Sequence, residues 1–331
     1  MTKQWTAEEL LKTAWSFQSA CLLTAAADMD LFSALHEGPL TADALADKIT
    51  ADLRATTILA DALVAIELLT KEDAEYSLPP DVAELLCESS PNNVLPTVRH
   101  LNNCLRSWSR LAGVTRTGAP AERKPGIHGR AADQAAFIGA MHTISAPMAA
   151  RVIDRLGPLD FNHLLDVGGA SGTWTLRFLQ VVPSARATIF DLPDVIPMAR
   201  QRIADAGLTD RVTFAPGDFY QDDLPAGADF AWLGAITHQN SRRQNRELFA
   251  KVHTALEDKG SIVLRDVVMD PSHTSPLPGA LFAVNMLVNT PKGGTYTFDE
   301  FAEDLTTAGF TDAALVHKHE FMESLIRAEK K

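Results

Sequence analysis

From Phe161 onward, short apolar segments alternate with helical segments, and this alternation limits the possible folds more than any other feature. The apolar segments are "HLLDVGG", "ATIFDLP", "VTFAPGD", "ADFAWLGAIT" and "GSIVLRDVVMD", and helical periodicity is found in "TWTLRFLQVV", "VIPMARQRIADAG" and "RQNRELFAKVHTAL". Such alternation predicts a parallel sheet covered by helices, with ligands bound at the carboxyl ends of the strands. We therefore expect residues 158–331 to form an α/β, Rossmann-like domain.

Residues 1–100 have helical periodicity instead. "AEELLKTAWSFQSACLLTAAADMDLFSALHEG" has apolar residues at three- and four-residue spacing, "LTADALADKI" begins at the N-cap residue Thr41, and "DLRATTILADALVAIELL" is amphipathic. "TKEDAEYSL" has the pattern of a short hairpin. This order predicts an all-helical winged-helix domain that ends in a hairpin wing.

The charge of this region distinguishes between two roles of a winged helix, which are DNA binding and dimerisation. Residues 1–100 carry six Lys/Arg and sixteen Asp/Glu, and the whole chain has a net charge of −12. The third helix offers Asp52, Arg54, Asp61 and Glu67 as its polar face. Because such a surface repels phosphate backbones, we expect packing or dimerisation and no nucleic-acid partner.

The middle of the chain predicts a connection between two domains. Residues 101–130 are rich in Gly, Pro and Arg and are interpreted as a linker, followed by a long helix over about 131–157. Together, 101–157 form the linker and connecting helix.

Several sequence features also favour a cytoplasmic protein. The chain has three cysteines, no secretory signal pattern and no apolar run of the roughly 20 residues that span a membrane. These features favour a cytoplasmic protein with no membrane partner, disulfide or structural zinc.

A glycine turn follows the first strand of the second domain, in "LLDVGGASGT". Gly168, Gly169 and Gly172 stand where the strand turns into a helix, which lets the backbone approach a ligand closely. A plain turn explains them equally well. The spacing differs from the G-x-G-x-x-G of dinucleotide enzymes, and Asp166 would repel a pyrophosphate. A cationic ligand without phosphate fits better.

Two further acids follow the next two strands. Asp191 is placed to accept ribose hydroxyls, and Asp218 is placed to accept the adenine amino group, with Phe219 against the ring. Each alone is also typical of a turn or cap. Acids at three successive strand ends predict an adenosine with a cationic, phosphate-free tail, which is S-adenosylmethionine.

On these motifs the chain resembles, over nearly its whole length, the dimeric S-adenosylmethionine-dependent O-methyltransferases of the caffeic acid/acetylserotonin type. "DVGGASG", "FDLP" and "GDFY" match the family's cofactor motifs, which places Leu192 at the cofactor. "FIGAMHTIS" resembles its linking-helix motif, which implies that Phe137 and Met141 face the substrate and that Ser145 lies near the cofactor. On composition alone, Phe137 and Met141 are typical core residues.

The resemblance also implies an architecture and a cofactor. It implies a class I methyltransferase domain preceded by a winged-helix dimerisation domain, and a homodimer formed through that domain. The cofactor would be S-adenosylmethionine, with S-adenosylhomocysteine as product, and the partner a small-molecule acceptor.

His238, in "AITHQNSRRQN", matches the family's catalytic histidine. From the residues alone, a polar residue at the start of a helix is an equal interpretation. In many members this histidine stands in a His-Asp-Trp triplet, whereas Gln239 and Asn240 follow it here.

Other positions also depart from the family pattern. Asp266 matches an acid, often Glu, that orients the histidine; Thr295 replaces a second Glu; and Gly234 replaces a lysine that contacts the cofactor in plant members. Met286 matches a residue that grips an aromatic ring. Asn285, Asn289 and Thr290 are candidate pocket residues, although loop contacts explain them equally well.

These observations predict an O-methyltransferase that acts on a hydroxyl of a small, aromatic metabolite. His238 would be the general base and Asp266 its orienting partner, without a metal, because the close pair His317 and His319 lies away from the cofactor loops. Three alternatives stay open. In the first, a relative keeps the cofactor but decarboxylates or hydroxylates a polyketide-like substrate. The second is a dehydrogenase, which Asp166 and the glycine spacing disfavour, and the third is a transcriptional regulator, which the acidic N-terminal region disfavours. The acceptor atom, whether O, N or S, is also open.

Overall fold

The computed structural model describes residues 3–120, 122–169 and 171–331. The chain divides into two compact units, the first made of residues 1–106 and 124–143 and the second of residues 107–123 and 144–331. Each unit has its own hydrophobic core.

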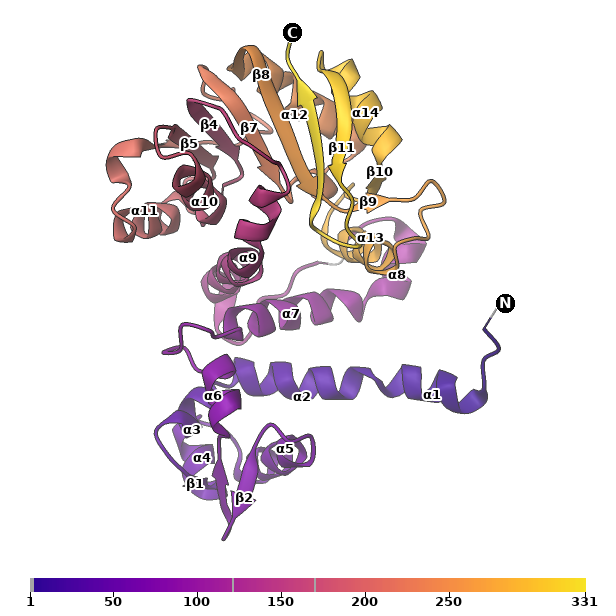
Figure 1. Ribbon diagram of the computed structural model, residues 1–331. Helices are drawn as coiled ribbons and strands as arrows, with labels where there is room; N and C mark the ends of the chain where they lie inside the picture. Colours follow the sequence, from indigo (N-terminus) through magenta and orange to yellow (C-terminus); the bar gives the residue numbers. More distant parts are fainter. Residues whose placement is uncertain (1–2, 121, 170) are drawn as a thin grey trace. The chain divides into compact units, whose positions relative to one another are not determined.

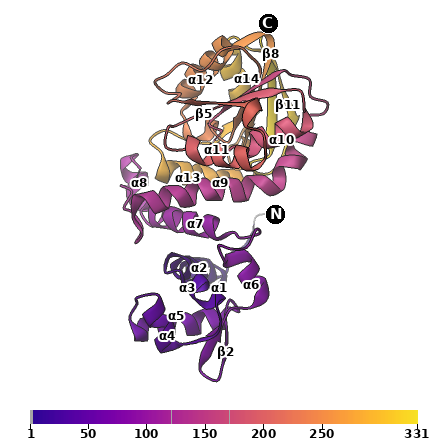
Figure 2. The same ribbon diagram turned by 90° about the vertical axis from the view of Figure 1, so that its left-hand side faces the viewer.

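The first unit begins with a run of helices and contains the predicted wing. Its elements are α1 (Ala7–Trp15), α2 (Phe17–Asp28), α3 (Leu31–His36), β1 (Leu40–Thr41), α4 (Ala42–Lys48), α5 (Leu53–Ala65), β2 (Thr70–Glu72), β3 (Glu75–Ser77), α6 (Pro80–Leu86) and α7 (Leu95–Trp108). The hairpin of β2 and β3 projects beyond α4 and α5 (Figure 2). The predicted order of helices and wing is confirmed. Leu40 and Thr41 add one short strand to the predicted wing, because they pair with β3 and complete a three-stranded sheet.

The first helix of this unit has no buried residue. Five large apolar side chains on and beside α1 are each more than half exposed, and we call them the N-terminal apolar face: Trp5, Leu10, Leu11, Trp15 and Phe17. α1 extends away from α3, α4 and α5 of its own unit (Figure 1). Apolar surface of this extent is typical of an interaction site.

The predicted linker is largely helical, which corrects the interpretation of residues 101–130. α7 runs to Trp108, and α8 covers Leu111–Thr117. Apolar residues at three- to four-residue spacing (Leu101, Leu105, Trp108, Leu111 and Val114) outweigh the Gly and Arg content. α8 ends at Gly118, which has the left-handed φ of 68° that favours glycine.

The long connecting helix α9 covers Gly129–Asp154, close to the predicted 131–157. By length and composition it is the one helix in the described part of the chain that passes a test for a membrane span. Ala149, Val152 and Ile153 are buried in the core of the second unit, as in the core helix of a soluble protein.

The second unit is built on a seven-stranded sheet. Its strands are β4 (His163–Val167), β5 (Arg186–Asp191), β6 (Val212–Pro216), β7 (Ala228–Gly234), β8 (Leu256–Asp266), β11 (Thr311–His317) and β12 (Ser324–Glu329), in the order β11-β12-β8-β7-β4-β5-β6. The five strands predicted first are parallel. The sheet is nevertheless mixed rather than parallel, because β12 runs antiparallel to both of its neighbours.

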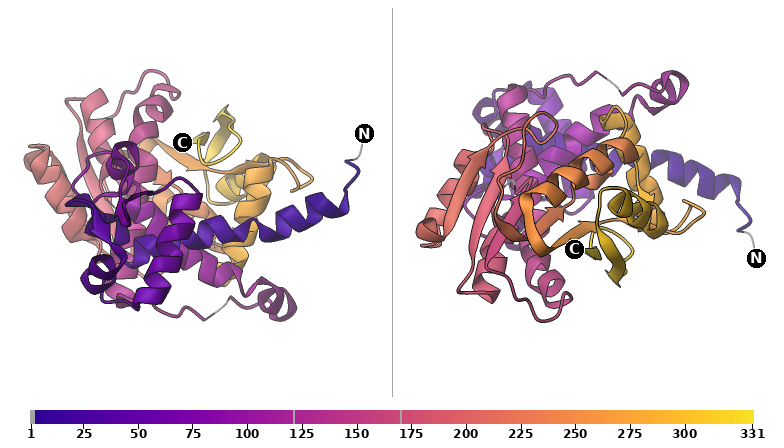
Figure 3. Two further views of the ribbon diagram at one scale, coloured as in Figure 1. Left: turned by 90° about the horizontal axis from the view of Figure 1, so that it is seen from below. Right: turned by 90° about the horizontal axis from the view of Figure 1, so that it is seen from above.

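Helices cover both faces of this sheet, as predicted. One core joins α9, α10 (Thr173–Val181) and α11 (Ile196–Asp205) to one face, and the other joins α12 (Arg242–Ala255) and α14 (Phe298–Thr307) to the opposite face. α12 and α14 pack against each other, in orange and yellow in the right-hand view of Figure 3. The remaining elements are η1 (Thr209–Arg211), η2 (Thr237–Gln239), β9 (Val268–Met269), α13 (Leu277–Asn289) and β10 (Tyr296–Thr297).

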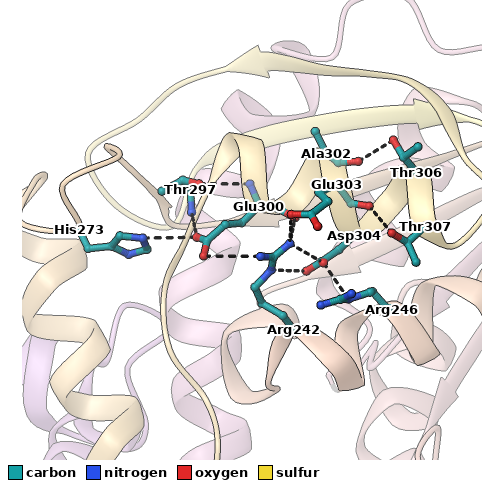
Figure 4. A network of polar contacts seen from close by, with 10 residues as sticks. All are labelled: Arg242, Arg246, His273, Thr297, Glu300, Ala302, Glu303, Asp304, Thr306 and Thr307. Carbon is teal, nitrogen blue, oxygen red and sulfur yellow. Dashed lines mark hydrogen bonds and ion pairs between the residues drawn. The ribbon is translucent and has the colours of Figure 1, made fainter.

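Figure 4 shows the ion-pair network that ties α12 to α14. Arg242 donates from Nε and Nη2 to the two oxygens of Asp304, at 3.0 and 2.8 Å, and from Nη2 to Glu303 at 2.8 Å. The Asp304 side chain is only 2% exposed, whereas Glu303 is 63% exposed. Because η2 directly precedes α12, this network holds the helix that follows His238.

We expect Asp304→Ala to lower the free energy of unfolding by about 1.5–3 kcal/mol, because the charged hydrogen bonds from Arg242 and the ion pair with Arg246 would be lost. Glu303→Ala is the matched control and should cost less than about 1 kcal/mol, since the lost pair is exposed. Urea unfolding followed by tryptophan fluorescence measures both. Equal losses in the two variants would contradict this account of the network.

Candidate active site

The loop after β4 is shaped by its glycines. Gly168 has a φ of 71°, and a Cβ there would lie 2.4 Å from the Ile236 side chain. A Cβ on Gly169 would lie 2.9 Å from Cγ of Asp166 and equally close to Ile189. Gly172 follows as the N-cap of α10. Glycine is therefore favoured by the left-handed φ at Gly168 and Gly172 and by the two close side chains at Gly169.

Asp166 lies beneath this loop rather than on its surface. It is 1% exposed, and its Oδ2 accepts a hydrogen bond from Thr175 Oγ1 at 2.6 Å. Burial, with a smaller contribution from the charge of Asp191, raises the pKa of Asp166 to about 7. A positive charge near this loop would favour the ionised form.

The other two predicted acids lie at neighbouring strand ends, because β4, β5 and β6 are adjacent and parallel. Asp191 is half-buried, and its Oδ1 accepts from the Leu192 backbone N–H at 2.7 Å. Leu192 is 48% exposed. The structure thus brings Asp166, Asp191 and the glycine loop to one edge of the sheet.

Asp218 lies two residues after the end of β6 and forms a turn. Its Oδ1 accepts from the Tyr220 N–H at 2.9 Å, and its Oδ2 accepts from Gln221 Nε2 at 2.8 Å. The Phe219 ring is half-buried and lies 4.6 Å from the Tyr220 ring, centroid to centroid. The alternative interpretation of Asp218 as a turn residue is therefore confirmed, and its ligand role stays a prediction.

His238 and Asp266 form a hydrogen-bonded pair. His238 lies on η2, after β7, and Asp266 ends the neighbouring parallel strand β8. Nδ1 of His238 lies 2.9 and 3.0 Å from the two carboxylate oxygens of Asp266. An ionised carboxylate only accepts, so Nδ1 carries the proton and Nε2 is left as a proton acceptor. The expected orienting acid is thus in contact with the expected base.

Asp266 is 3% exposed and is held ionised by its surroundings. Three further donors reach it: Thr237 Oγ1 at 2.5 Å, the His238 N–H at 3.2 Å and the Val267 N–H at 2.8 Å. Burial acts to raise the pKa of Asp266, but the His238 ring and these hydrogen bonds outweigh it, so the pKa lies below the usual value.

Two departures from the family pattern, Asn240 and Gly234, have structural explanations, and Thr295 has none. Asn240 is fully buried and makes side-chain hydrogen bonds. Gly294 donates from its backbone to the His238 carbonyl, which places the segment before the buried Thr295 against η2. A Cβ on Gly234 would lie 2.5 Å from Nε1 of the buried Trp232, so a lysine does not fit there unless the indole moves.

The predicted pocket residues on α13 bond chiefly to protein. Oδ1 of Asn285 accepts from Trp108 Nε1 at 2.9 Å and from Asn289 Nδ2 at 3.0 Å, and the Asn289 carbonyl accepts from Arg123. Met286 is buried. These are the contacts that the alternative interpretation expects, and the pocket role of the two asparagines stays a prediction. Thr290 bonds to the Met286 carbonyl in the same manner.

The linking-helix residues divide between the two units. Phe137 and Met141 belong to the first unit, where Phe137 is 46% exposed and its ring meets His100 edge-on at 5.2 Å. Ser145 belongs to the second unit and is buried. Their assignment to substrate and cofactor stays a prediction.

Two neighbours of the pair were missed from the sequence. Thr237 donates to Asp266, and the Phe282 ring meets the His238 ring edge-on at 4.8 Å. Phe282 precedes Met286 by one helical turn, so the spacing on α13 places both on one face. Thr237 precedes His238 directly, and only the pairing of β7 with β8 shows which acid it reaches.

Two family models match this chain. The model of the O-methyltransferase domain matches residues 98–311, and that of the O-methyltransferase dimerisation domain matches residues 11–89.

Relatives cover nearly the whole chain. The tetracenomycin polyketide synthesis 8-O-methyl transferase TcmO of Streptomyces glaucescens is 32% identical over 92% of this chain and 91% of its own length. The 3-hydroxy-5-methyl-1-naphthoate 3-O-methyltransferase of Streptomyces sahachiroi is 30% identical over 91% and 88%. Human N-acetylserotonin methyltransferase, solved in complex with SAM, superposes with a TM-score of 0.81 at 25% identity, over 100% of this chain and 99% of that one. With a matching fold, matching domains and relatives of this kind, the chain belongs to the O-methyltransferase family and carries both its methyltransferase domain and its dimerisation domain.

Proposed function

We propose that this protein uses S-adenosylmethionine to methylate a phenolic hydroxyl of a polycyclic, polyketide-type aromatic compound, with His238 as general base. The hydrogen-bonded pair of His238 and Asp266 is the observation that carries the proposal. The names of the TcmO and naphthoate relatives support the acceptor class.

The edge of the sheet fits such a cofactor. The loop of Gly168 and Gly169 leaves little room for side chains and presents backbone instead, and the Asp191 carboxylate lies at the next strand end, where ribose hydroxyls would be bound. Asp166 and Asp191 make the region favourable to a cation and unfavourable to phosphate. When bound, S-adenosylmethionine supplies a methyl group activated by its sulfonium and leaves as S-adenosylhomocysteine.

The residues of this chain then have to remove one proton. Nε2 of His238 accepts the proton of the acceptor hydroxyl while Nδ1 keeps its hydrogen bond to Asp266. The carboxylate stabilises the imidazolium that forms, and its four donors keep it from rotating away. Phe282 fixes the ring from the side. Positioning of the acceptor supplies much of the remaining rate enhancement.

We expect His238→Ala to lower kcat for methylation of a hydroxylated naphthoate or anthraquinone by about 10²–10⁴-fold, the usual contribution of a general base. His36→Ala, in the first unit, is the matched control and should leave kcat unchanged. Product formation is followed by mass spectrometry. A kcat for His238→Ala equal to that of the wild type would contradict the proposal that His238 is the general base.

The same assay separates the alternative chemistry. A product heavier by one methyl group supports methyl transfer. Loss of carbon dioxide or gain of oxygen from a polyketide acid, without methyl transfer to any acceptor, would instead support the decarboxylating or hydroxylating alternative.

Asp166 gives a pH-dependent prediction. Its pKa of about 7 in the folded protein lies above its ordinary value of 3.8, so the unfolded chain releases this proton first and stability falls as pH rises from about 4 to about 7. The amide side chain of the Asp166→Asn variant does not ionise, so its stability lacks this dependence on pH. We expect its gain in stability over wild type to be larger at pH 8 than at pH 5, by roughly 3 kcal/mol.

Urea unfolding at both pH values measures this difference. Asp160→Asn, an exposed acid six residues earlier, is the control and should show no pH-dependent gain. A gain for Asp166→Asn that is the same at both pH values would show that the Asp166 carboxyl ionises normally.

We further propose that the N-terminal apolar face forms a homodimer contact. The dimerisation-domain match begins at residue 11, within α1, and this helix buries nothing within its own chain. Burial of several large apolar side chains against a second copy provides the driving force.

We expect Trp15→Glu to weaken the dimer at least about tenfold, since a charge would be buried in an apolar contact. Ile58→Glu, which replaces an exposed apolar residue on α5, should not. Analytical ultracentrifugation distinguishes the two. A monomeric wild type, or equal weakening by both variants, would contradict the proposed contact.

A further inference from the structure

Asn240 stands where many family members have the tryptophan of the His-Asp-Trp triplet, and it is fully buried. A buried amide is tolerated when its polar atoms are bonded. Its Oδ1 accepts from the Tyr220 hydroxyl, its Nδ2 donates to Asn245 Oδ1 at 3.0 Å, and its backbone carbonyl accepts from the Tyr296 hydroxyl. Asn240 is therefore the centre of a polar network, and its role is not limited to filling part of the volume of a tryptophan.

The network continues to the catalytic pair. Asn245, on α12, is fully buried and donates from Nδ2 to the Thr237 carbonyl at 3.0 Å. Thr237 is 1% exposed and donates from Oγ1 to Asp266. Hydrogen bonds therefore connect Tyr220 through Asn240 and Asn245 to the carbonyl of Thr237. The side chain of the same Thr237 continues the path to the Asp266 carboxylate, which is bonded to His238.

The other end of this path lies in the loop that follows β6. The Tyr220 N–H is bonded to Asp218, its ring packs against Phe219, and Lys251 donates to the Phe219 carbonyl at 2.9 Å. This loop is the one proposed to bind adenine. The same tyrosine therefore has its backbone in the cofactor loop and its hydroxyl in the network behind His238.

We propose that Tyr220 is a positioning residue for His238, and that the path through Asn240, Asn245 and Thr237 links the geometry of the cofactor loop to the orientation of the base. The effect on rate rests on the proposed function, since His238 must be the base for the rate to respond.

A purely structural network would behave differently. It would fill the volume of the absent tryptophan and contribute to stability, and loss of one hydroxyl would lower the melting temperature without loosening the imidazole. A positioning role requires that the hydrogen bond from His238 Nδ1 to Asp266 respond to a change at Tyr220.

The test compares Tyr220→Phe with Tyr76→Phe, which removes a buried tyrosine hydroxyl in the first unit, bonded to Asp61. The first readout is solvent exchange of the His238 Nδ1 proton by NMR, assigned by its absence in His238→Ala. The second is kcat for methylation of a hydroxylated naphthoate, and the third is the Kd for S-adenosylhomocysteine by calorimetry.

In Tyr220→Phe we expect exchange of the Nδ1 proton to become about tenfold faster and kcat to fall about tenfold, the effect of one hydrogen bond. The Kd for S-adenosylhomocysteine should stay within about twofold, because the aromatic ring remains. All three readouts should be unchanged in Tyr76→Phe.

Three results would overturn the proposal: an unchanged exchange rate in Tyr220→Phe, a lower affinity for S-adenosylhomocysteine with kcat unaltered, or the same changes in Tyr76→Phe. Failure of the proposed function has a different signature, in which His238→Ala keeps wild-type methylation. Proton exchange still decides whether Tyr220 orients His238 in that case.

Discussion

The carboxylate of Asp266 accepts hydrogen bonds from four donors, and the geometry of the candidate active site depends on them. They join the end of β8 to the turn after β7, so two parallel strands fix one imidazole between them. A buried carboxylate is costly unless its lone pairs are occupied. Here the donors come from both strand ends, so the cost of burial is offset only when the two ends are in register.

Much of the methyltransferase unit could be predicted from its sequence. Apolar strands and amphipathic helices alternate from His163 to Asp266, and parallel strands bring the residues at their carboxyl ends together, as with Asp166, Asp191 and His238. The partnership of His238 with Asp266 followed from a resemblance rather than from spacing, because the two residues are 28 positions apart. The sequence of β12 does not indicate that this strand lies between β11 and β8 and runs antiparallel to both.

Other features depend on contacts that one sequence does not reveal. The helices of the predicted linker were hidden by local Gly and Arg, although Leu101, Leu105 and Trp108 keep helical spacing. Asn285 and Asn289 have the polarity of pocket residues, yet they bond to Trp108, to Arg123 and to each other. The role of Asn240 depends on Tyr220, Asn245 and Tyr296, which come from three different segments. Long-range partners of this kind require the fold.

The close approach of Trp232 to Gly234 bears on how members of the family can be interconverted. The indole lies in the core of the second unit and fills the space that any side chain at 234 would enter first. A lysine at 234 therefore requires the Trp232 indole to move or a smaller residue to replace it. A smaller residue at 232 would open a cavity beside Trp174 and Phe178. Introducing the plant lysine is therefore coupled to the packing of the core at position 232.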